Sequence, residues 1–192
     1  MSADERDDGD GEADLAVVLD FLPHGRTDDD RPQYEKQPLG YAMNVSDFEL
    51  YELVASDDAD ITFGDHVDVF GPAVEARNRI DYDDLPSGAQ SELDYAVEDL
   101  VDAEEGRFVD FYNEAQPITL RLHQLNLLPG IGKKLRNSIL DEREKRPFES
   151  FDDLASRVNG LHNPREVLVE RILEEIKEED LKYRTFARHE EQ

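Results

Sequence analysis

The sequence predicts an α+β protein in which a small β-barrel or sandwich is followed by a helical region. Between residues 14 and 84, short apolar segments with alternating or β-branched residues are separated by turn residues, a pattern typical of strands. After Leu85 the apolar residues recur every three or four positions, which indicates amphipathic helices. The chain has 192 residues, enough for one larger or two small domains.

Four or five strands are expected in the first region. They are predicted, in chain order, within residues 15–22, 39–45, 48–54, 61–70 and 73–80. The third segment is ambiguous, because Ser46 and Glu49 form a capping-box pattern typical of a helix. Its short length and aromatic residues favour a strand instead. We favour a strand that forms a hairpin with the second segment.

Several helices are expected in the second region. Ser87 and Gln90 form a capping-box pattern at the start of the first helix, and Gly106 is expected just beyond its end. Another helix is predicted over residues 107–114, and Pro117 is expected to restart the helical path. Later helix boundaries are predicted at Pro147, Ser150, Asn163 and Pro164.

Residues 128–134, with the sequence LPGIGKK, are the most informative segment. The two glycines suit a tight turn that opens a helix, and the apolar residue between them can hold the turn in place. The first N–H groups of that helix, together with its dipole, favour an anion. We therefore predict a helix-hairpin-helix motif that grips a nucleic-acid backbone without reading its bases. The predicted binding residues are Leu128, Pro129, Gly130, Ile131, Gly132, Lys133, Lys134 and Arg136.

The charge distribution favours this interpretation over a plain helix–helix connection. The chain carries 21 basic and 48 acidic residues, for a net charge of −27. Residues 117–192 hold 14 of the basic and 15 of the acidic residues, so nearly all the excess acid precedes them. Residues 120–147 hold seven basic and three acidic residues, which is the local footprint expected of a nucleic-acid site.

The excess acid resembles an adaptation to concentrated intracellular salt, and we expect a haloarchaeal source. Acidic clusters at residues 28–30, 57–60 and 81–84 are expected to be solvated surface and not metal sites. The five histidines show no metal-ligand spacing, and no P-loop, dinucleotide or nucleophile motif is present, so we expect no enzyme activity. The absence of cysteine and of long apolar runs predicts a cytoplasmic protein without a membrane association.

A second, weaker hairpin is predicted 30 residues after the first. Residues 158–161 (VNGL) align with residues 128–131 (LPGI), which would give a tandem helix-hairpin-helix domain. His162 stands where the first hairpin has Gly132, and Asn163 stands where it has Lys133. We therefore interpret the segment Gly160-Leu161-His162-Asn163 as structural, with at most a secondary contact to a ligand.

The C-terminal region resembles tandem helix-hairpin-helix domains of DNA repair, recombination and DNA-uptake proteins, through LLPGIGKK, RPFESFDDLASRV and GLHNPREVLVERIL. The chain from about residue 14 resembles the archaeal family called domain of unknown function 655, through stretches such as GDHVDVFG, SELDYAVEDLV and RFVDFYNEAQPITLRLHQLNLLPGIGKKL. That resemblance implies an RNA- or DNA-binding protein with an OB-like barrel and a tandem helix-hairpin-helix domain. It also implies that K⁺ or Na⁺ bridges a phosphate and hairpin carbonyls, here those of Leu128 and Ile131.

The expected organisation is an acidic disordered tail (1–13), an OB-like barrel (14–84), connecting helices (85–116), a tandem helix-hairpin-helix domain (117–178) and a flexible tail (179–192). We expect a non-catalytic protein that binds RNA or DNA largely independently of sequence. The alternatives are a protein-interaction adaptor in a ribosome or DNA-repair assembly and, less favoured, a DNA-processing enzyme in which Asp152 or Asp153 is catalytic.

Overall fold

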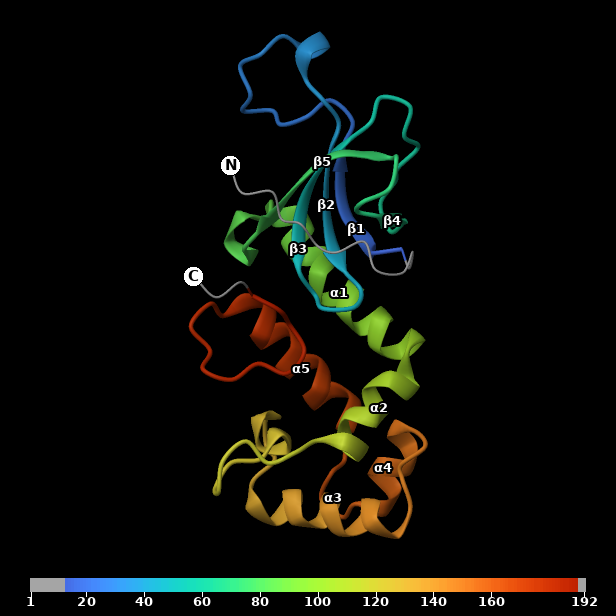
Figure 1. Ribbon diagram of the computed structural model, residues 1–192, viewed down its shortest axis with the longest axis vertical. Helices are drawn as coiled ribbons and strands as arrows, with labels where there is room; N and C mark the ends of the chain where they lie inside the picture. The colour runs from blue at the N-terminus through green and yellow to red at the C-terminus, as the bar shows by residue number, and fades with distance from the viewer. Residues whose placement is uncertain (1–12, 190–192) are drawn as a thin grey trace. The chain divides into compact units, whose positions relative to one another are not determined.

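A computed structural model describes residues 13–189 of the chain, which divide into two compact units (Figure 1). The sheet unit comprises residues up to 46 together with residues 50–79, and the helical unit comprises residues 47–49 and those from 80 onward. The predicted acidic tail at residues 1–13 lies, apart from its last residue, outside the described residues.

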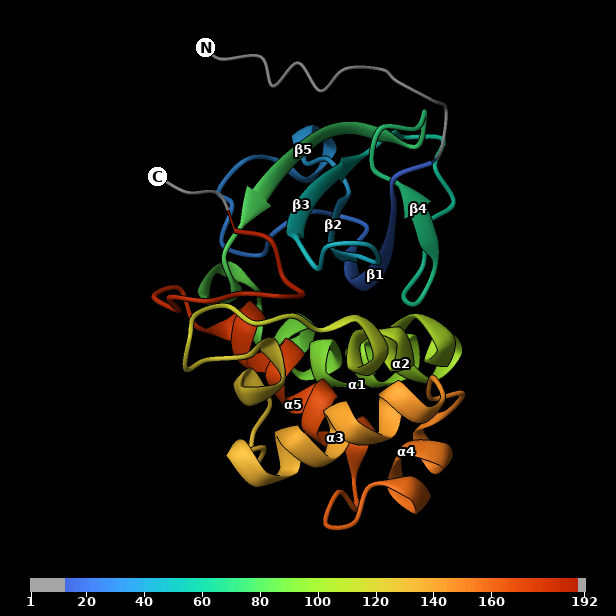
Figure 2. The same ribbon diagram turned by 60° about the horizontal axis from the view of Figure 1, so that its bottom comes forward.

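The sheet unit is a five-stranded, curled antiparallel sheet (Figures 1 and 2). Its strands are β1 (Leu15–Leu22), β2 (Leu39–Asn44), β3 (Leu50–Ala55), β4 (His66–Asp68) and β5 (Val74–Ile80), in the order β4-β1-β2-β3-β5. A short 3-10 helix, η1 (Gln33–Glu35), interrupts the long connection between β1 and β2. The edges β4 and β5 do not close the sheet, so the predicted barrel is a half-barrel.

The ambiguous third segment forms a strand, as we favoured. β3 pairs with β2 in antiparallel register, with Ala42 opposite Tyr51, and the two strands form the predicted hairpin. The capping-box pattern is not used for a helix because Phe48 adopts a φ of +61° in the connecting turn. β4 is shorter than the predicted segment, since Gly64 has a φ of +82° and turns the chain just before it.

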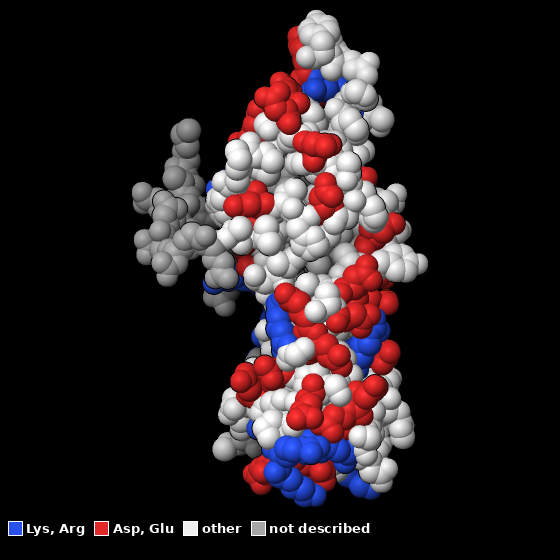
Figure 3. All heavy atoms as spheres, turned by 90° about the vertical axis from the view of Figure 1, so that its right-hand side faces the viewer, with Lys and Arg blue, Asp and Glu red and all other residues white. Residues whose placement is uncertain are grey.

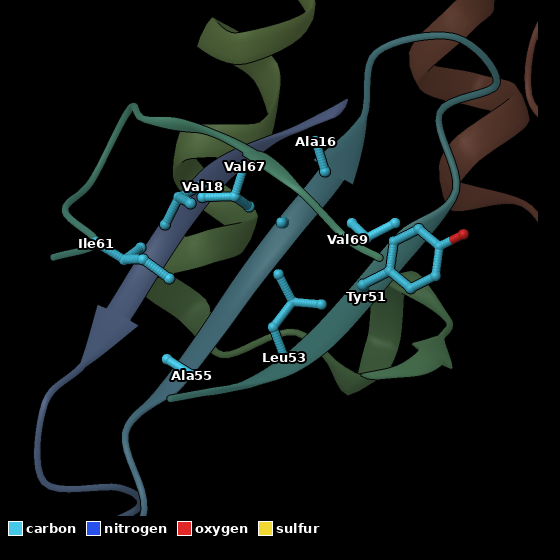
Figure 4. Close-up of a cluster of buried hydrophobic side chains, with 9 residues drawn as sticks. Ala16, Val18, Tyr51, Leu53, Ala55, Ile61, Val67 and Val69 are labelled. Carbon is cyan, nitrogen blue, oxygen red and sulfur yellow. The ribbon is translucent and has the colours of Figure 1, made fainter. Parts of the chain in front are cut away.

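The core of the sheet unit lies on one face of the curled sheet (Figure 4). In β1 and β3 the residues that point into it alternate along the strand, because successive side chains of a strand face opposite sides. The buried residues are Ala16, Val18, Ala42, Tyr51, Leu53, Ala55, Ile61, Val67 and Val69. Small and β-branched residues dominate this set, which fits the tight concave side of a curled sheet.

The helical unit contains five α-helices: α1 (Ser87–Ala103), α2 (Glu105–Glu114), α3 (Lys133–Lys145), α4 (Phe151–Arg157) and α5 (Pro164–Lys177). A 3-10 helix, η2 (Tyr82–Asp84), precedes α1. α1 packs against α5 through an apolar stripe, and α5 also contacts α4. Within the described part of the chain, no helix is long and apolar enough to cross a membrane.

One predicted cap and one predicted helix end are wrong. Ser87 is the first residue of α1 and its side chain makes no capping bond, whereas the Gln90 amide donates to the Tyr82 carbonyl. Gly106 lies inside α2 and does not end α1, because the chain already turns at Glu104 (φ −116°, ψ 40°).

Pro117 does not restart an α-helix. It forms an isolated β-bridge with His123, and a four-residue 3-10 helix, η3 (Gln124–Leu127), follows. An α-helix does not form here because the Thr119 hydroxyl accepts hydrogen bonds from the backbone N–H groups of Arg121 (3.2 Å) and Leu122 (3.0 Å). Such local bonds offer the backbone an alternative to helical pairing.

The described part of the predicted flexible tail makes specific hydrogen bonds. The carboxylate of Glu175, fully buried on α5, accepts from the N–H groups of Thr185, Phe186 and Ala187 at 2.7–2.9 Å. The same carboxylate pairs with buried Arg171 at 3.0 Å. Residues 183–187 are therefore held against α5 by a charge buried in that helix.

Candidate nucleic-acid interface

The predicted hairpin at residues 128–134 forms a tight turn between η3 and α3. Gly130 adopts a φ of +79°, a conformation that favours glycine. The Ile131 N–H donates to the Leu128 carbonyl at 3.2 Å, and both of these side chains are buried. Leu128 and Ile131 thus anchor the turn. Gly130, which lies between them, and Gly132, which follows Ile131, are exposed.

Gly132 is explained neither by conformation nor by packing. It precedes the first residue of α3 with an extended backbone (φ −86°, ψ −170°) that any residue can adopt. A Cβ atom added at Gly132 would meet no other atom within 4 Å. The missing side chain therefore leaves the start of α3 open to solvent.

The first turn of α3 has the chemistry of an anion site. No side chain caps its N–H groups, and it contains no acidic residue, although the chain has 48. Two exposed lysines, Lys133 and Lys134, stand there instead, where a positive charge opposes the helix dipole. α1 also lacks a side-chain cap and a first-turn acid, but its first turn carries no lysine. α4 begins with a Ser150 cap and two aspartates, and α5 has Glu166 in its first turn.

The basic residues around α3 differ in their partners. At the far end of α3 and in α4, Lys145 pairs with Glu142 at 2.7 Å and Arg157 pairs with Asp153 at 3.1 Å. Lys133 and Lys134 have no carboxylate within ion-pairing distance among the described residues. On the face that Figure 3 shows, lysine and arginine atoms gather at one end of the helical unit, interspersed with acidic atoms.

Asn126 in η3 joins the turn to its surroundings. Its side-chain N–H donates to the Ile131 carbonyl at 3.1 Å, and its oxygen accepts from the His123 N–H and from the Arg136 guanidinium, each at 3.1 Å. Arg136, predicted to bind a ligand, is half-buried and also bonds to Asn137. Sequence reasoning missed Asn126, although an asparagine at the N3 position of a cap was a usable signal.

His123 caps η3 through a ring nitrogen. Its Nδ1 accepts from the Leu125 N–H at 3.1 Å, so this nitrogen carries no proton. Burial lowers the pKa of His123, and the positive charges of Arg143 and Arg136 lower it further. The ring is therefore a structural group at the base of the turn, a role that the sequence alone did not indicate.

The second predicted hairpin repeats two features of the first turn, a positive glycine φ and one turn hydrogen bond. Gly160 adopts a φ of +96°, and the Leu161 N–H donates to the Val158 carbonyl at 3.2 Å. A Cβ at Gly160 would lie 3.7 Å from the Leu135 side chain, so this turn packs against the start of α3. Beyond it, however, Pro164 supplies no N–H group to the first turn of α5.

The acidic residues considered for catalysis or metal binding have other roles. The Asp153 carboxylate accepts from the Glu149 N–H at 3.1 Å, and this bond lowers its pKa. Its own N–H donates to the Ser150 hydroxyl at 2.9 Å, which confirms the predicted cap of α4. No cluster of three or more metal-ligating side chains occurs within residues 13–189.

These features define the class of protein: an α+β chain in which a curled antiparallel sheet precedes a five-helix unit with two similar glycine turns. The chain belongs to the family described as protein of unknown function (DUF655), whose sequence profile matches residues 12–188. The predicted family is thereby confirmed.

Two relatives share most of the chain. The uncharacterized protein MJ0038 of Methanocaldococcus jannaschii is 37% identical over 168 residues, which are 85% of this chain and 74% of the relative. A solved DUF655 structure, Af1531 from Archaeoglobus fulgidus, is 40% identical and covers 91% of this chain and 99% of its own, with a TM-score of 0.81. Both relatives are archaeal.

Proposed function

We propose that this protein binds a nucleic-acid backbone without catalysing a reaction, and that the turn at residues 128–132 and the start of α3 form a helix-hairpin-helix phosphate clamp. In this proposal, the uncapped N–H groups of the first turn of α3 hold one phosphate. Lys133 and Lys134 contact the neighbouring phosphates, while Arg136 holds the turn through Asn126. Such contacts fix the position of a strand but do not read its sequence.

The observation that carries the proposal is the chemistry of this one helix start. The absence of a side-chain cap, the absence of an acidic residue and the two lysines without acidic partners all weaken the start of a helix in isolation, and the exposed Gly132 leaves that start accessible. Each of these features becomes favourable when an anion binds. A structural connection alone would be better served by a serine or aspartate at Gly132.

The strand order of the sheet unit is compatible with a second contact with nucleic acid. Its strand order, β4-β1-β2-β3-β5, is the order in which the five strands of an OB barrel follow one another. OB folds bind single strands by stacking bases on aromatic residues. Tyr41, Phe48 and Tyr51 are all buried, so these three aromatic residues are not available for stacking on bases.

A monovalent cation is compatible with the turn. The Leu128 carbonyl accepts from the Ile131 N–H and the Ile131 carbonyl accepts from Asn126. Each oxygen has a second lone pair that could contact K⁺ or Na⁺. In the proposed clamp these two carbonyls would hold such an ion, which would add positive charge near the phosphate.

A charge placed at Gly132 tests the clamp. Gly132→Glu puts a carboxylate beside the proposed phosphate, and the variant should fold because the position is open. We expect the affinity for single- and double-stranded RNA and DNA to fall about tenfold, equivalent to ~1.4 kcal/mol. The measurement is a fluorescence-anisotropy titration with labelled oligonucleotides in a KCl series.

Gly106→Glu is the matched control. Gly106 is also exposed, also has no atom within 4 Å of an added Cβ, and also lies near the start of a helix of the same unit. It should leave affinity unchanged. Equal affinity of both variants and the wild type would contradict the clamp, and loss of a co-purifying protein only in Gly132→Glu would favour the adaptor alternative.

A further inference from the structure

Leu120 is the most exposed large apolar residue of the described chain. Its relative exposure is 106%, so it has no packing role. The next residue, Arg121, is also exposed and has no carboxylate within ion-pairing distance among residues 13–189. Together they place an apolar side chain beside a positive charge at the tip of a loop.

The loop that carries Leu120 is held in one conformation by hydrogen bonds. The N–H groups of Ile118 and Thr119 donate to the Leu122 carbonyl at 2.7 and 3.0 Å. The Thr119 hydroxyl accepts from the N–H groups of Arg121 and Leu122, and a bridge between Pro117 and His123 closes the base. An apolar residue at the tip of an ordered loop is pre-organised for insertion.

The same loop is joined to the proposed clamp. Its last residue, His123, donates its N–H to Asn126, whose side chain donates to the Ile131 carbonyl inside the glycine turn. Figures 1 and 2 both place the loop, drawn in yellow, on the side of the helical unit where α3 begins. The loop and the start of α3 therefore lie on the same side of the helical unit.

We propose that Leu120 is a wedge that inserts between two adjacent bases of the strand held by the clamp, with Arg121 contacting a phosphate beside it. Apolar side chains inserted at a base step unstack it, at a cost of a few kcal/mol. That cost is lowest where a nucleotide is already unpaired or mismatched. The preferred substrate class is thus a duplex with a bulged or unpaired nucleotide, and this inference rests on the proposed function.

The test compares wild-type protein with Leu120→Ala on two RNA or DNA duplexes, one fully paired and one with a single bulged nucleotide next to a 2-aminopurine. We expect the wild type to bind the bulged duplex about tenfold more tightly than the paired one. Leu120→Ala should lose this preference but keep its affinity for the paired duplex within about twofold. The 2-aminopurine fluorescence should rise on binding of the wild type, since the base is unstacked, and should stay low with Leu120→Ala.

Tyr95→Ala is the control, because Tyr95 is 64% exposed on α1 of the same helical unit. It should bind and unstack as the wild type does. The wedge would be overturned if the wild type and Leu120→Ala each bound the paired and the bulged duplex with equal affinity. If Gly132→Glu still weakened binding to both duplexes, the clamp would stand without the wedge. Absence of binding to every duplex and single strand would overturn the clamp and the wedge together.

Discussion

His123 links the protonation of one ring to the geometry of the glycine turn. The ring Nδ1 accepts from the Leu125 N–H. The backbone N–H of His123 donates to the Asn126 side chain, which in turn donates to the Ile131 carbonyl. Protonation of Nδ1 would replace an acceptor with a donor facing another donor. The turn should therefore be sensitive to acid at this residue.

The direction of the pH effect follows from the lowered pKa of His123. The unfolded chain takes up this proton near pH 6.5, about the unperturbed histidine value, whereas the folded protein takes it up at a lower pH. The stabilisation is thus complete above about pH 6.5 and is lost as the pH falls through the folded pKa. We expect the Tm of the wild type to fall between about pH 7.5 and about pH 5.5.

His123→Asn is the comparison, because its side-chain oxygen can accept the same bond and does not titrate. The Tm of this variant should fall less over the same pH range, measured by calorimetry at constant KCl. Parallel decreases in the two proteins would assign the acid sensitivity to other groups.

The residues of the glycine turn were predictable from sequence, but their supports were not. Glycine, lysine and the buried Ile131 are adjacent in the chain, so their pattern alone indicates a tight turn before a helix. Asn126 and His123 act through hydrogen bonds whose partners are defined only by the 3-10 helix η3. That helix replaces an expected α-helical approach, because the Thr119 hydroxyl competes for backbone donors.

Among the elements, α5 and the segment after it depend on one buried carboxylate. Glu175 accepts three backbone N–H groups and pairs with Arg171. We expect Glu175→Gln to lower the free energy of unfolding by roughly 3–5 kcal/mol, because it removes the buried negative charge that pairs with Arg171 and places an amide NH2 donor where backbone N–H donors converge. Chemical denaturation measures this loss, and faster hydrogen exchange at Thr185 to Ala187 would locate it.

Glu174→Gln is the matched control one residue away. The Glu174 side chain is 44% exposed and pairs with the same arginine at 2.9 Å. Its loss should cost at most about 1 kcal/mol, as for other exposed ion pairs. Equal costs for the two variants would contradict the role assigned to Glu175.

Helix caps give a second prediction for the elements. Ser150 and Ser87 both looked like caps in the sequence, but only the Ser150 hydroxyl accepts a helix N–H, that of Asp153 at 2.9 Å. We expect Ser150→Ala to reduce the free energy of unfolding by about 1 kcal/mol. Ser87→Ala should change it by less than about 0.5 kcal/mol. Urea titrations of both variants decide, and a cost at Ser87 equal to that at Ser150 would contradict the assignment.

Strand segments were predicted more reliably than helix ends. Alternation and β-branched residues mark a strand along its whole length, and β1 and β5 nearly coincide with the expected segments. A helix end depends on a few hydrogen bonds that the sequence does not show, so the predicted cap at Ser87 and the predicted helix end at Gly106 were wrong. The polar tail also misled, because composition does not show that three of its N–H groups converge on a carboxylate ten or more residues earlier.

At the scale of the whole molecule, the excess acid predicts a dependence on salt. The carboxylates of Asp57, Asp58 and Asp60 are exposed, as expected for solvated surface acid. At about 1 M salt the Debye length is ~3 Å, so repulsion among such groups is screened. We expect the Tm to rise between about 0.1 M and about 2 M KCl.

Replacing these three aspartates with asparagine should reduce the rise in Tm, since less repulsion then remains to be screened. Calorimetry of the two proteins across the KCl series gives the comparison. A Tm that is independent of KCl in the wild type would contradict an acidic surface adapted to concentrated salt.

The second glycine turn makes the proposed clamp asymmetric. The turns at Gly130 and Gly160 share a positive glycine φ and one turn hydrogen bond, but the helix after the second begins with Pro164 and carries Glu166. If two such turns faced the two strands of a duplex, only one strand would meet free N–H groups and lysines. The protein would then distinguish one strand from the other by geometry alone, and would sit on a duplex in a single orientation.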